Sequence, residues 1–140
     1  MIFRYKSVKR PDGTLVKIPS IPISLLGKEN FDTIALVDSG ADISAMPKEM
    51  AEVLGLKLDG EISYAYGIGG KAKCIETRVM IIIEQKHEIY KLHIPVKVVL
   101  ENYSFPFLLG RAGFFDEFIV SFDQVNERIS LKKIEKNRVY

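Results

Sequence analysis

The sequence predicts a mostly β domain with a single helix, and three observations support this fold class. Apolar and polar residues alternate from Ile21 to Leu25, which is the period-two pattern of a half-buried strand. Turn signals such as Pro11-Asp12-Gly13 separate the extended apolar segments. One convincing helical pattern lies between Pro47, which suits a first helical position, and Gly55, which suits a helix stop.

The β-rich class rests on a series of extended segments joined by short turns. We expect strands at residues 2–9, 14–18, 21–25, 31–37, 61–66, 74–84, 89–100, 105–109, 119–123 and 128–134. Turn residues between neighbouring segments predict hairpins that span 2–18, 61–84 and 119–134.

The helix and the prolines refine this arrangement. We expect a short helical turn over residues 112–118. Proline removes a backbone donor from a sheet, so Pro22 predicts an edge or irregular strand, and Pro95 predicts an edge or a bulge. The apolar side chains at helical spacing are interpreted as core residues: Met46, Met50, Val53 and Leu54.

The composition is that of one ordinary globular domain. The chain has 140 residues, of which 47% are hydrophobic and 27% charged. A net charge of +2 gives too weak a field to indicate a nucleic acid or membrane partner. The run from Val79 to Ile83 is too short to span a bilayer, and the N-terminus lacks a signal-peptide core. The single cysteine, Cys74, excludes an internal disulfide, so we expect a cytoplasmic protein.

Metal, triad and phosphate sites find little support in the sequence. His87 and His93 are the only histidines, and no cluster of carboxylates or cysteines joins them. Neither has a nucleophile with the context of a catalytic triad. The glycines at 67–70 lack a P-loop pattern, and no helix pattern follows them. We therefore expect no metal ion and no cofactor.

The strongest candidate for chemistry is Asp38, at the end of an apolar strand. Ser39 and Gly40 follow it and turn the chain sharply, and Ala41 and Asp42 come next. A carboxylate fixed at a rigid strand-to-loop corner is well placed for acid–base catalysis. An ordinary Asp-Ser-Gly turn is the alternative interpretation of these residues alone.

Four features in a fixed order resemble the retropepsin-like aspartic proteases, the single-domain relatives of the retroviral proteases. They are the strand ending in Asp38-Ser39-Gly40-Ala41-Asp42, the glycine-tipped hairpin at 66–70, the Phe-Leu-Leu-Gly-Arg segment at 107–111, and the helical turn after it. The resemblance covers about residues 21–120. It implies a closed β-barrel with one helix after the active-site loop and a helical turn near residue 112.

The resemblance also implies a role for each matching residue. Asp38 is the expected catalytic aspartate, Ser39 helps to lock two active-site loops together, and Gly40 allows the tight turn. Ala41 and Asp42 line the substrate cleft, and Asp42 also pairs with Arg111. Leu109 and Gly110 pack beside the catalytic loop. The expected flap, which closes over bound peptide, consists of Tyr66, Gly67, Ile68, Gly69 and Gly70.

The chemistry of this class requires two carboxylates that share one proton. The sequence contains only one Asp-Ser/Thr-Gly triplet, because Asp12-Gly13 and Asp59-Gly60 lack the middle hydroxyl residue. An active enzyme must therefore be a symmetric homodimer with one Asp38 from each subunit. The expected substrate is a peptide or an unfolded protein.

Two points separate this chain from the retroviral enzymes. We interpret residues 1–140 as one domain, with an N-terminal extension at 1–19 and a C-terminal hairpin at 119–134, and these ends predict a different dimer interface.

A catalytically silent module that binds peptides or acts as a scaffold is the alternative function. An unrelated small β-barrel gives no role to the ordered set of motifs.

Overall fold

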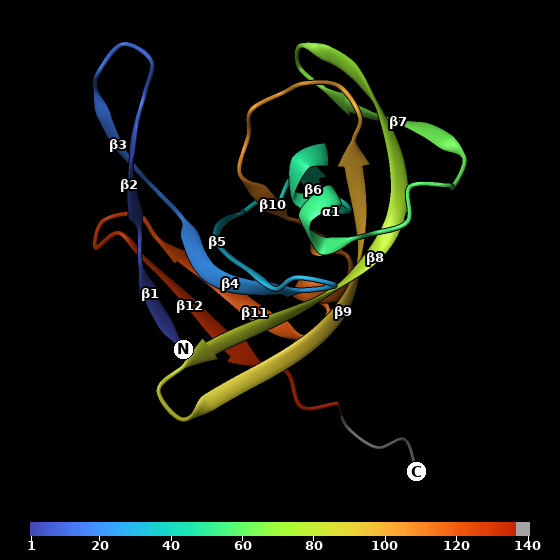
Figure 1. Cartoon of the computed structure of the whole chain (residues 1–140). Helices are drawn as coiled ribbons and strands as arrows, with labels where there is room; N and C mark the ends of the chain where they lie inside the picture. The colour runs from blue at the N-terminus through green and yellow to red at the C-terminus, as the bar shows by residue number, and fades with distance from the viewer. Residues whose placement is uncertain (137–140) are drawn as a thin grey trace.

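The protein was analysed as a computed structural model that describes residues 1–136, so the end of the expected 1–140 domain lies outside it. The chain forms twelve strands, one regular helix and one irregular helical turn in this described part (Figure 1). In order, they are β1 (Ile2–Arg4), β2 (Lys6–Lys9), β3 (Leu15–Ile18), β4 (Ser20–Leu26), β5 (Phe31–Val37), β6 (Ser44–Pro47), α1 (Lys48–Leu54), β7 (Ile62–Gly67), β8 (Gly70–Gln85), β9 (Glu88–Val99), β10 (Phe107–Leu109), η1 (Arg111–Phe115), β11 (Phe118–Asp123) and β12 (Arg128–Lys133).

A closed barrel forms the body of the fold. The main sheet has the strand order β4-β5-β10-β6-β9-β8-β7, and β4 also pairs with β8. This extra pairing joins Ser24–Leu26 to Met80–Ile82 and closes a ring of six strands. Closure removes most free sheet edges, which otherwise invite pairing with other chains. The predicted mainly β, closed-barrel class is therefore confirmed.

The two prolines lie where their strands have a neighbour on one side only. Pro22 pairs with Ile34 of β5, and the pairing of β4 with β8 begins at Ser24. Pro95 pairs with Arg78 of β8, in an unbroken register, and the pairing of β9 with β6 begins one residue later. The expectation of an edge thus holds locally, whereas β4 as a whole is a closing strand of the barrel and β9 has no bulge here.

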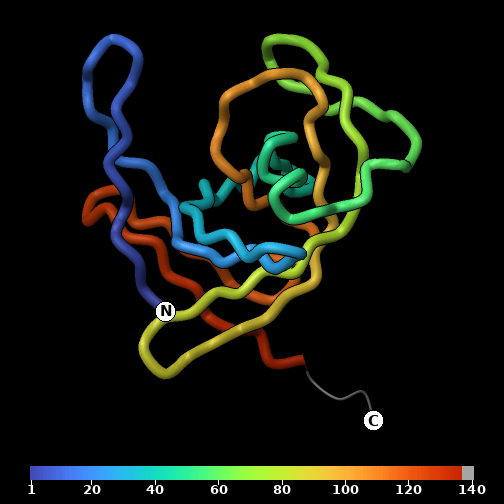
Figure 2. Tube along the Cα trace, viewed as in Figure 1, coloured from blue at the N-terminus to red at the C-terminus, as the bar shows by residue number. Residues whose placement is uncertain are grey.

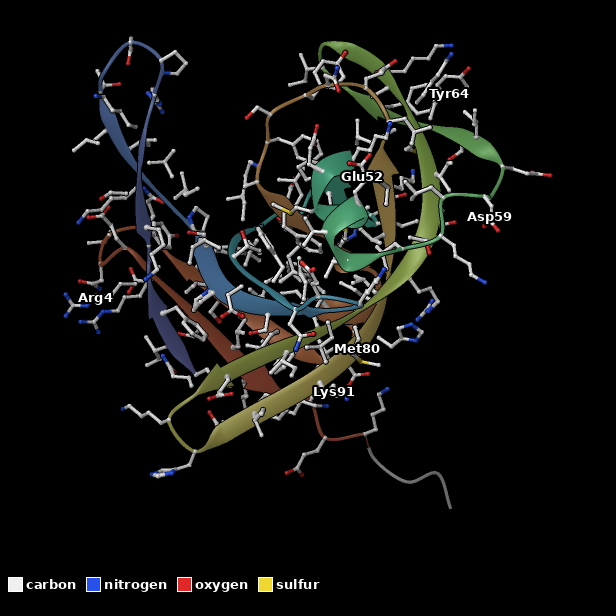
Figure 3. The ribbon with its side chains drawn as sticks, in the orientation of Figure 1. Arg4, Glu52, Asp59, Tyr64, Met80 and Lys91 are labelled. Carbon is white, nitrogen blue, oxygen red and sulfur yellow. The ribbon has the colours of Figure 1, made fainter. Side chains whose placement is uncertain are left out.

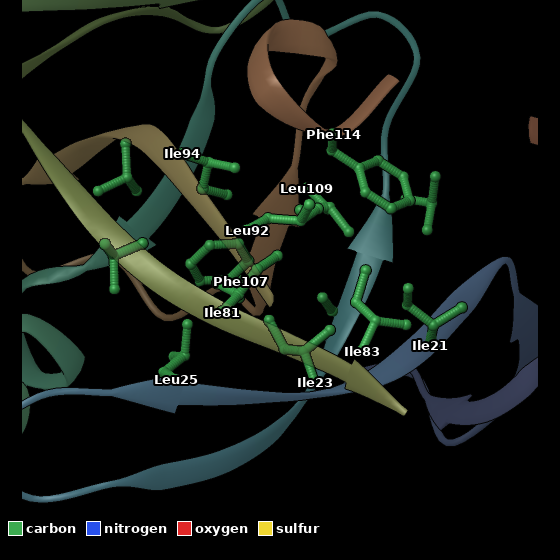
Figure 4. Packing of buried hydrophobic residues seen from close by; sticks show 14 of the residues in the cluster. Ile21, Ile23, Leu25, Ile81, Ile83, Leu92, Ile94, Phe107, Leu109 and Phe114 are labelled. Atoms are coloured by element: carbon green, nitrogen blue, oxygen red, sulfur yellow. The ribbon is translucent and has the colours of Figure 1, made fainter. Parts of the chain in front are cut away.

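The barrel interior is filled by aliphatic and aromatic side chains from most of its strands (Figure 4). Full burial of one such side chain stabilises the fold by roughly 1.5–3 kcal/mol. Ten of the buried residues are labelled in the figure: Ile21, Ile23, Leu25, Ile81, Ile83, Leu92, Ile94, Phe107, Leu109 and Phe114.

The predicted helix is real, but its details differ from the expectation. Pro47 is the N-cap and ends β6, and Gly55 ends α1 in the left-handed conformation at φ 67°. Met46 is fully buried, but it lies in β6, a strand that the sequence did not predict. Val53 is 40% exposed, so its assignment to the core was wrong. Met46 precedes α1, and the helix is oriented so that Ala51 and Leu54 form its buried side and Val53 faces outward.

The chain ends form a separate three-stranded sheet in the order β1-β12-β11. The predicted C-terminal hairpin is confirmed, with Phe122 opposite Ile129. The predicted first strand is split, because Tyr5 is buried and donates its backbone N–H to Glu127 O, and β1 and β2 lie on either side of it. No helix among residues 1–136 is long and apolar enough to cross a membrane.

Candidate active site

Asp38 occupies the position where β5 ends, as predicted. Its backbone N–H donates to Leu109 O at 3.0 Å, which continues the parallel pairing of β5 with β10. The preceding N–H, that of Val37, donates to Pro19 O at 2.9 Å. The backbone around Asp38 is therefore tied to a neighbouring segment on each side, and the carboxylate leaves the sheet from a fixed point.

The residues after Asp38 form a tight turn that orients its carboxylate. The N–H of Gly40 donates to Asp38 Oδ1 at 2.9 Å, and the N–H of Ala41 donates to Asp38 O at 3.2 Å. A Cβ at Gly40 would lie 3.3 Å from Asp38 Oδ1, tighter than most real contacts. Asp38 is half-buried, while Ser39 and Gly40 are exposed. One carboxylate oxygen is thus held by the backbone at the surface of the barrel.

A second segment, Gly110 to Ala112, is hydrogen-bonded along the Asp38 loop. The N–H of Arg111 donates to Ala41 O and that of Ala112 to Asp42 O, both at 2.9 Å. The N–H of Gly110 donates to Ser44 Oγ at 2.9 Å in the interior. A Cβ at Gly110 would lie 2.7–2.8 Å from backbone atoms of residues 43 and 44, so only glycine fits there. The predicted packing of Leu109 and Gly110 beside the loop matches this geometry.

The predicted ion pair between Asp42 and Arg111 is absent. No salt bridge among residues 1–136 joins them. Arg111 Nη1 instead donates to Ser39 O at 2.7 Å. Asp42 Oδ1 accepts the N–H of Ile43 at 2.9 Å. Both charged groups bind backbone atoms of the same loop. The short Asp42 side chain accepts the neighbouring N–H and therefore does not extend to Arg111.

The expected flap is the β7–β8 hairpin. Gly67 pairs with Gly70, so Ile68 and Gly69 form a two-residue turn, and Gly70 has φ +123°. Ile68 is fully exposed, and Tyr66 is 80% exposed. Figure 3 shows Tyr64 beside β7, and Lys71 Nζ lies 4.4 Å from the centroid of its ring. The hairpin carries exposed apolar side chains and a glycine-rich tip.

The structure adds two features that the sequence did not single out. Ser44 is fully buried and its hydroxyl accepts the Gly110 N–H. Its place inside the apolar run from Ile43 to Met46 is a signal for a satisfied buried hydroxyl. Tyr103, on the loop between β9 and β10, lines a surface hollow together with residues of the β7–β8 hairpin, among them Ala65 and Ala72.

Among the side chains described, no cluster of three or more His, Cys, Asp or Glu residues is arranged to hold a metal ion. The candidate site therefore consists of one carboxylate and the backbone groups around it.

Comparisons of the sequence give no match, either to a family model or to a curated protein. Comparison of the structure gives matches to solved structures. A retropepsin-like aspartic protease from Rickettsia conorii superposes with a TM-score of 0.61 at 21% identity, over 94% of this chain and 88% of that one. The chain has a retropepsin-like fold.

A second solved structure, the EIAV protease complexed with the inhibitor HBY-793, gives a TM-score of 0.46 at 22% identity, over 68% of this chain and 83% of that one. The closed barrel of six strands matches the retropepsin-like fold.

Proposed function

We propose that the protein is an aspartic endopeptidase that acts as a homodimer. The observation that carries the proposal is the Asp38 loop: a carboxylate at the end of β5, held by the Gly40 N–H and hydrogen-bonded to a second segment through Leu109 and Arg111. Its place on a retropepsin-like barrel supports the same chemistry. Such a rigid setting keeps a catalytic group in one geometry.

In the proposed mechanism, the Asp38 carboxylates of two subunits share one proton. Two neighbouring carboxylates resist joint ionisation, so one is charged and one is protonated at mildly acidic pH. The charged carboxylate takes a proton from a water molecule, which attacks the peptide carbonyl carbon. The protonated carboxylate donates a hydrogen bond to the carbonyl oxygen, and a proton then passes to the leaving nitrogen.

The remaining residues bind and enclose the substrate in this proposal. Ser39 helps to hold the two catalytic loops together, and Ala41 and Asp42 line the cleft. The flap tip from Gly67 to Gly70 closes over an extended peptide and limits the access of water. An extended chain is the expected substrate because a folded one does not fit beneath two hairpins.

A cleavage assay tests this function. The wild-type protein and Asp38→Asn are incubated with denatured protein and a peptide library between about pH 4 and 7. We expect cleavage by the wild type, loss of cleavage in Asp38→Asn, and full activity in the control Glu29→Gln, which changes an exposed carboxylate in the turn between β4 and β5. Specific activity should fall on dilution, because each site needs two chains.

The same assay distinguishes the proposed enzyme from the alternative, a catalytically silent peptide-binding module. Peptide binding without cleavage under every condition would contradict the enzyme and favour the module. Cleavage that survives in Asp38→Asn would contradict the assignment of the catalytic residue. A monomer that keeps full activity on dilution would contradict the dimer.

A further inference from the structure

The hairpin formed by β2 and β3, residues 6–18 and here called the arm, stands apart from the barrel. Its two strands pair only with each other, with Val8 opposite Val16. Figures 1 and 2 show it projecting beyond the barrel at the upper left of the view. None of the other described elements packs extensively against it. An isolated two-stranded hairpin is marginally stable in water, and the ion pair that joins the arm to the rest of the described chain is the exposed contact of Lys17 Nζ with Glu127 Oε1 at 3.7 Å.

The surface of the arm is both apolar and basic. Val8 is 41% exposed and Leu15 is 73% exposed, although both are strand residues. The arm carries four basic residues, Lys6, Lys9, Arg10 and Lys17, and one acidic residue, Asp12. Its net charge of +3 exceeds the +2 of the whole chain, so the rest of the chain carries −1. The arm and the rest of the chain are therefore opposite in charge.

The base of the arm adjoins the candidate catalytic residue. Ile18 ends β3, and the carbonyl oxygen of the next residue, Pro19, accepts the N–H of Val37 at 2.9 Å. Val37 is followed directly by Asp38. The arm thus leaves the barrel at the edge where the Asp38 loop begins.

We propose that the arm docks on a second copy of this chain and forms part of the interface that completes the active site. This inference rests on the proposed function, in which two Asp38 carboxylates come within hydrogen-bond distance. The second copy must then lie against the edge from which the arm extends. Four or five extended residues give the arm a reach of about 15 Å. Because Val8 pairs with Val16, Val8 and Leu15 lie on opposite faces of the hairpin, and a partner buries both only if it encloses the arm from both faces. Docking also brings the basic arm against a chain whose other residues carry the opposite net charge.

Hydrogen exchange tests the docking without any substitution. The amides of residues 6–18 are followed in the wild-type protein at concentrations above and below its dimer dissociation constant, which sedimentation measures. We expect slow exchange in the dimer and exchange at least about tenfold faster in the monomer, because a bare hairpin opens readily. Fast exchange of the arm at both concentrations would overturn the proposal.

Substitutions on the arm give an independent measure. The double variant Val8→Thr with Leu15→Gln keeps the charge of the hairpin but removes its two most exposed apolar side chains, one from each face. We expect the dimer dissociation constant to rise at least about tenfold, as truncation of a central apolar contact does in other interfaces. The matched control is Ile89→Thr, because Ile89 is 60% exposed on the β8–β9 hairpin. It should leave the dissociation constant unchanged.

The outcomes distinguish a failure of the arm interface from a failure of the proposed function. A wild-type dimer that cleaves peptide and is unaffected by the double variant would overturn the arm interface and leave the protease standing. Absence of both a dimer and cleavage at all concentrations would overturn both. If the double variant weakens binding to RNA or to anionic vesicles and leaves dimerisation intact, the arm serves another partner and the proposal is wrong.

Discussion

Arg111 and Ser39 are joined by a 2.7 Å hydrogen bond from the guanidinium Nη1 to the backbone carbonyl oxygen. The backbone N–H of Arg111 also binds Ala41 O at 2.9 Å, so one residue holds the loop on both sides of Gly40. The carboxylate of Asp38 is oriented by the N–H of that same glycine. Arg111 is therefore a positioning residue for Asp38, and it acts through the backbone of the loop rather than through Asp42.

Replacing Arg111 should lower the turnover rate more than it lowers stability. In Arg111→Ala the Ser39 carbonyl loses its charged donor at an exposed position, so the free energy of unfolding should fall by about 1 kcal/mol or less. A shift of the Asp38 loop by a fraction of an ångström should reduce kcat by about tenfold or more, with KM changing little. Steady-state kinetics and urea unfolding measure the two effects.

The matched control for this variant is Arg78→Ala. Arg78 also donates a 2.7 Å hydrogen bond to a backbone carbonyl, that of His93, but it does so along the β8–β9 pair. The Arg78→Ala variant should lose as much free energy of unfolding as Arg111→Ala and keep the wild-type kcat. Equal losses of kcat in both variants would show that general loosening of the barrel, and not the Ser39 contact, causes the effect.

Gly110 should tolerate no side chain. In Gly110→Ala the new Cβ would lie 2.7–2.8 Å from Ile43 C, Ile43 O and Ser44 N, all of them backbone atoms that cannot rotate away. Relief of this clash must separate β10 from β6 and stretch the buried hydrogen bond to Ser44 Oγ. We expect a loss of about 2–4 kcal/mol in the free energy of unfolding.

Urea unfolding of Gly110→Ala and Gly69→Ala checks this expectation. No atom lies within 4 Å of a Cβ built at Gly69, so that variant should stay within about 0.5 kcal/mol of the wild type. If the two alanine variants unfold at the same urea concentration, the tight packing of residue 110 is refuted.

The sequence predicts most of the strands and the position of Asp38, because both depend on local patterns. Period-two alternation locates β4, and an apolar run that ends in a polar turn locates β5. The sequence does not predict β6, a four-residue strand between a loop and a helix, because β9 and β10, the strands that pair with β6, are distant in sequence. The predicted pairing of Arg111 with Asp42 is wrong for a similar reason. The short Asp42 carboxylate can accept a hydrogen bond from the adjacent backbone, and no local sequence pattern reveals that choice.

Acid should selectively remove the contribution of Glu117 to stability. Lys133 donates to Glu117 Oε2 at 2.8 Å and Lys136 to Oε1 at 2.9 Å. The hydrogen bond from Lys133, followed by that from Lys136, holds the pKa of Glu117 below its ordinary value of 4.5. A carboxylate with a lowered pKa in the folded state stabilises the fold above its unfolded pKa, and this contribution is lost as pH falls through the folded pKa.

The comparison of the wild type with Glu117→Gln isolates this effect. The difference in their free energies of unfolding should be about 1 kcal/mol and constant from pH 5 to pH 9, since the pair is partly buried. It should shrink steadily below about pH 4.5. The hydrogen bond to Glu117 also raises the pKa of Lys136 above 10.5, so the contribution of that contact should fade only above this pH.

Urea unfolding at pH 3, 4, 5, 7 and 9 provides the measurement. Asp12 and Asp123 also have lowered pKa values, from hydrogen bonds to Thr14 and to Asn126. Their contributions are common to both proteins and cancel in the difference. Glu29→Gln, in which an exposed carboxylate without an ion pair among the described residues is lost, serves as the control for the removal of one surface charge. A difference for Glu117→Gln that persists unchanged from pH 7 to pH 3 would mean that the Glu117 contacts with Lys133 and Lys136 do not stabilise the fold through charge.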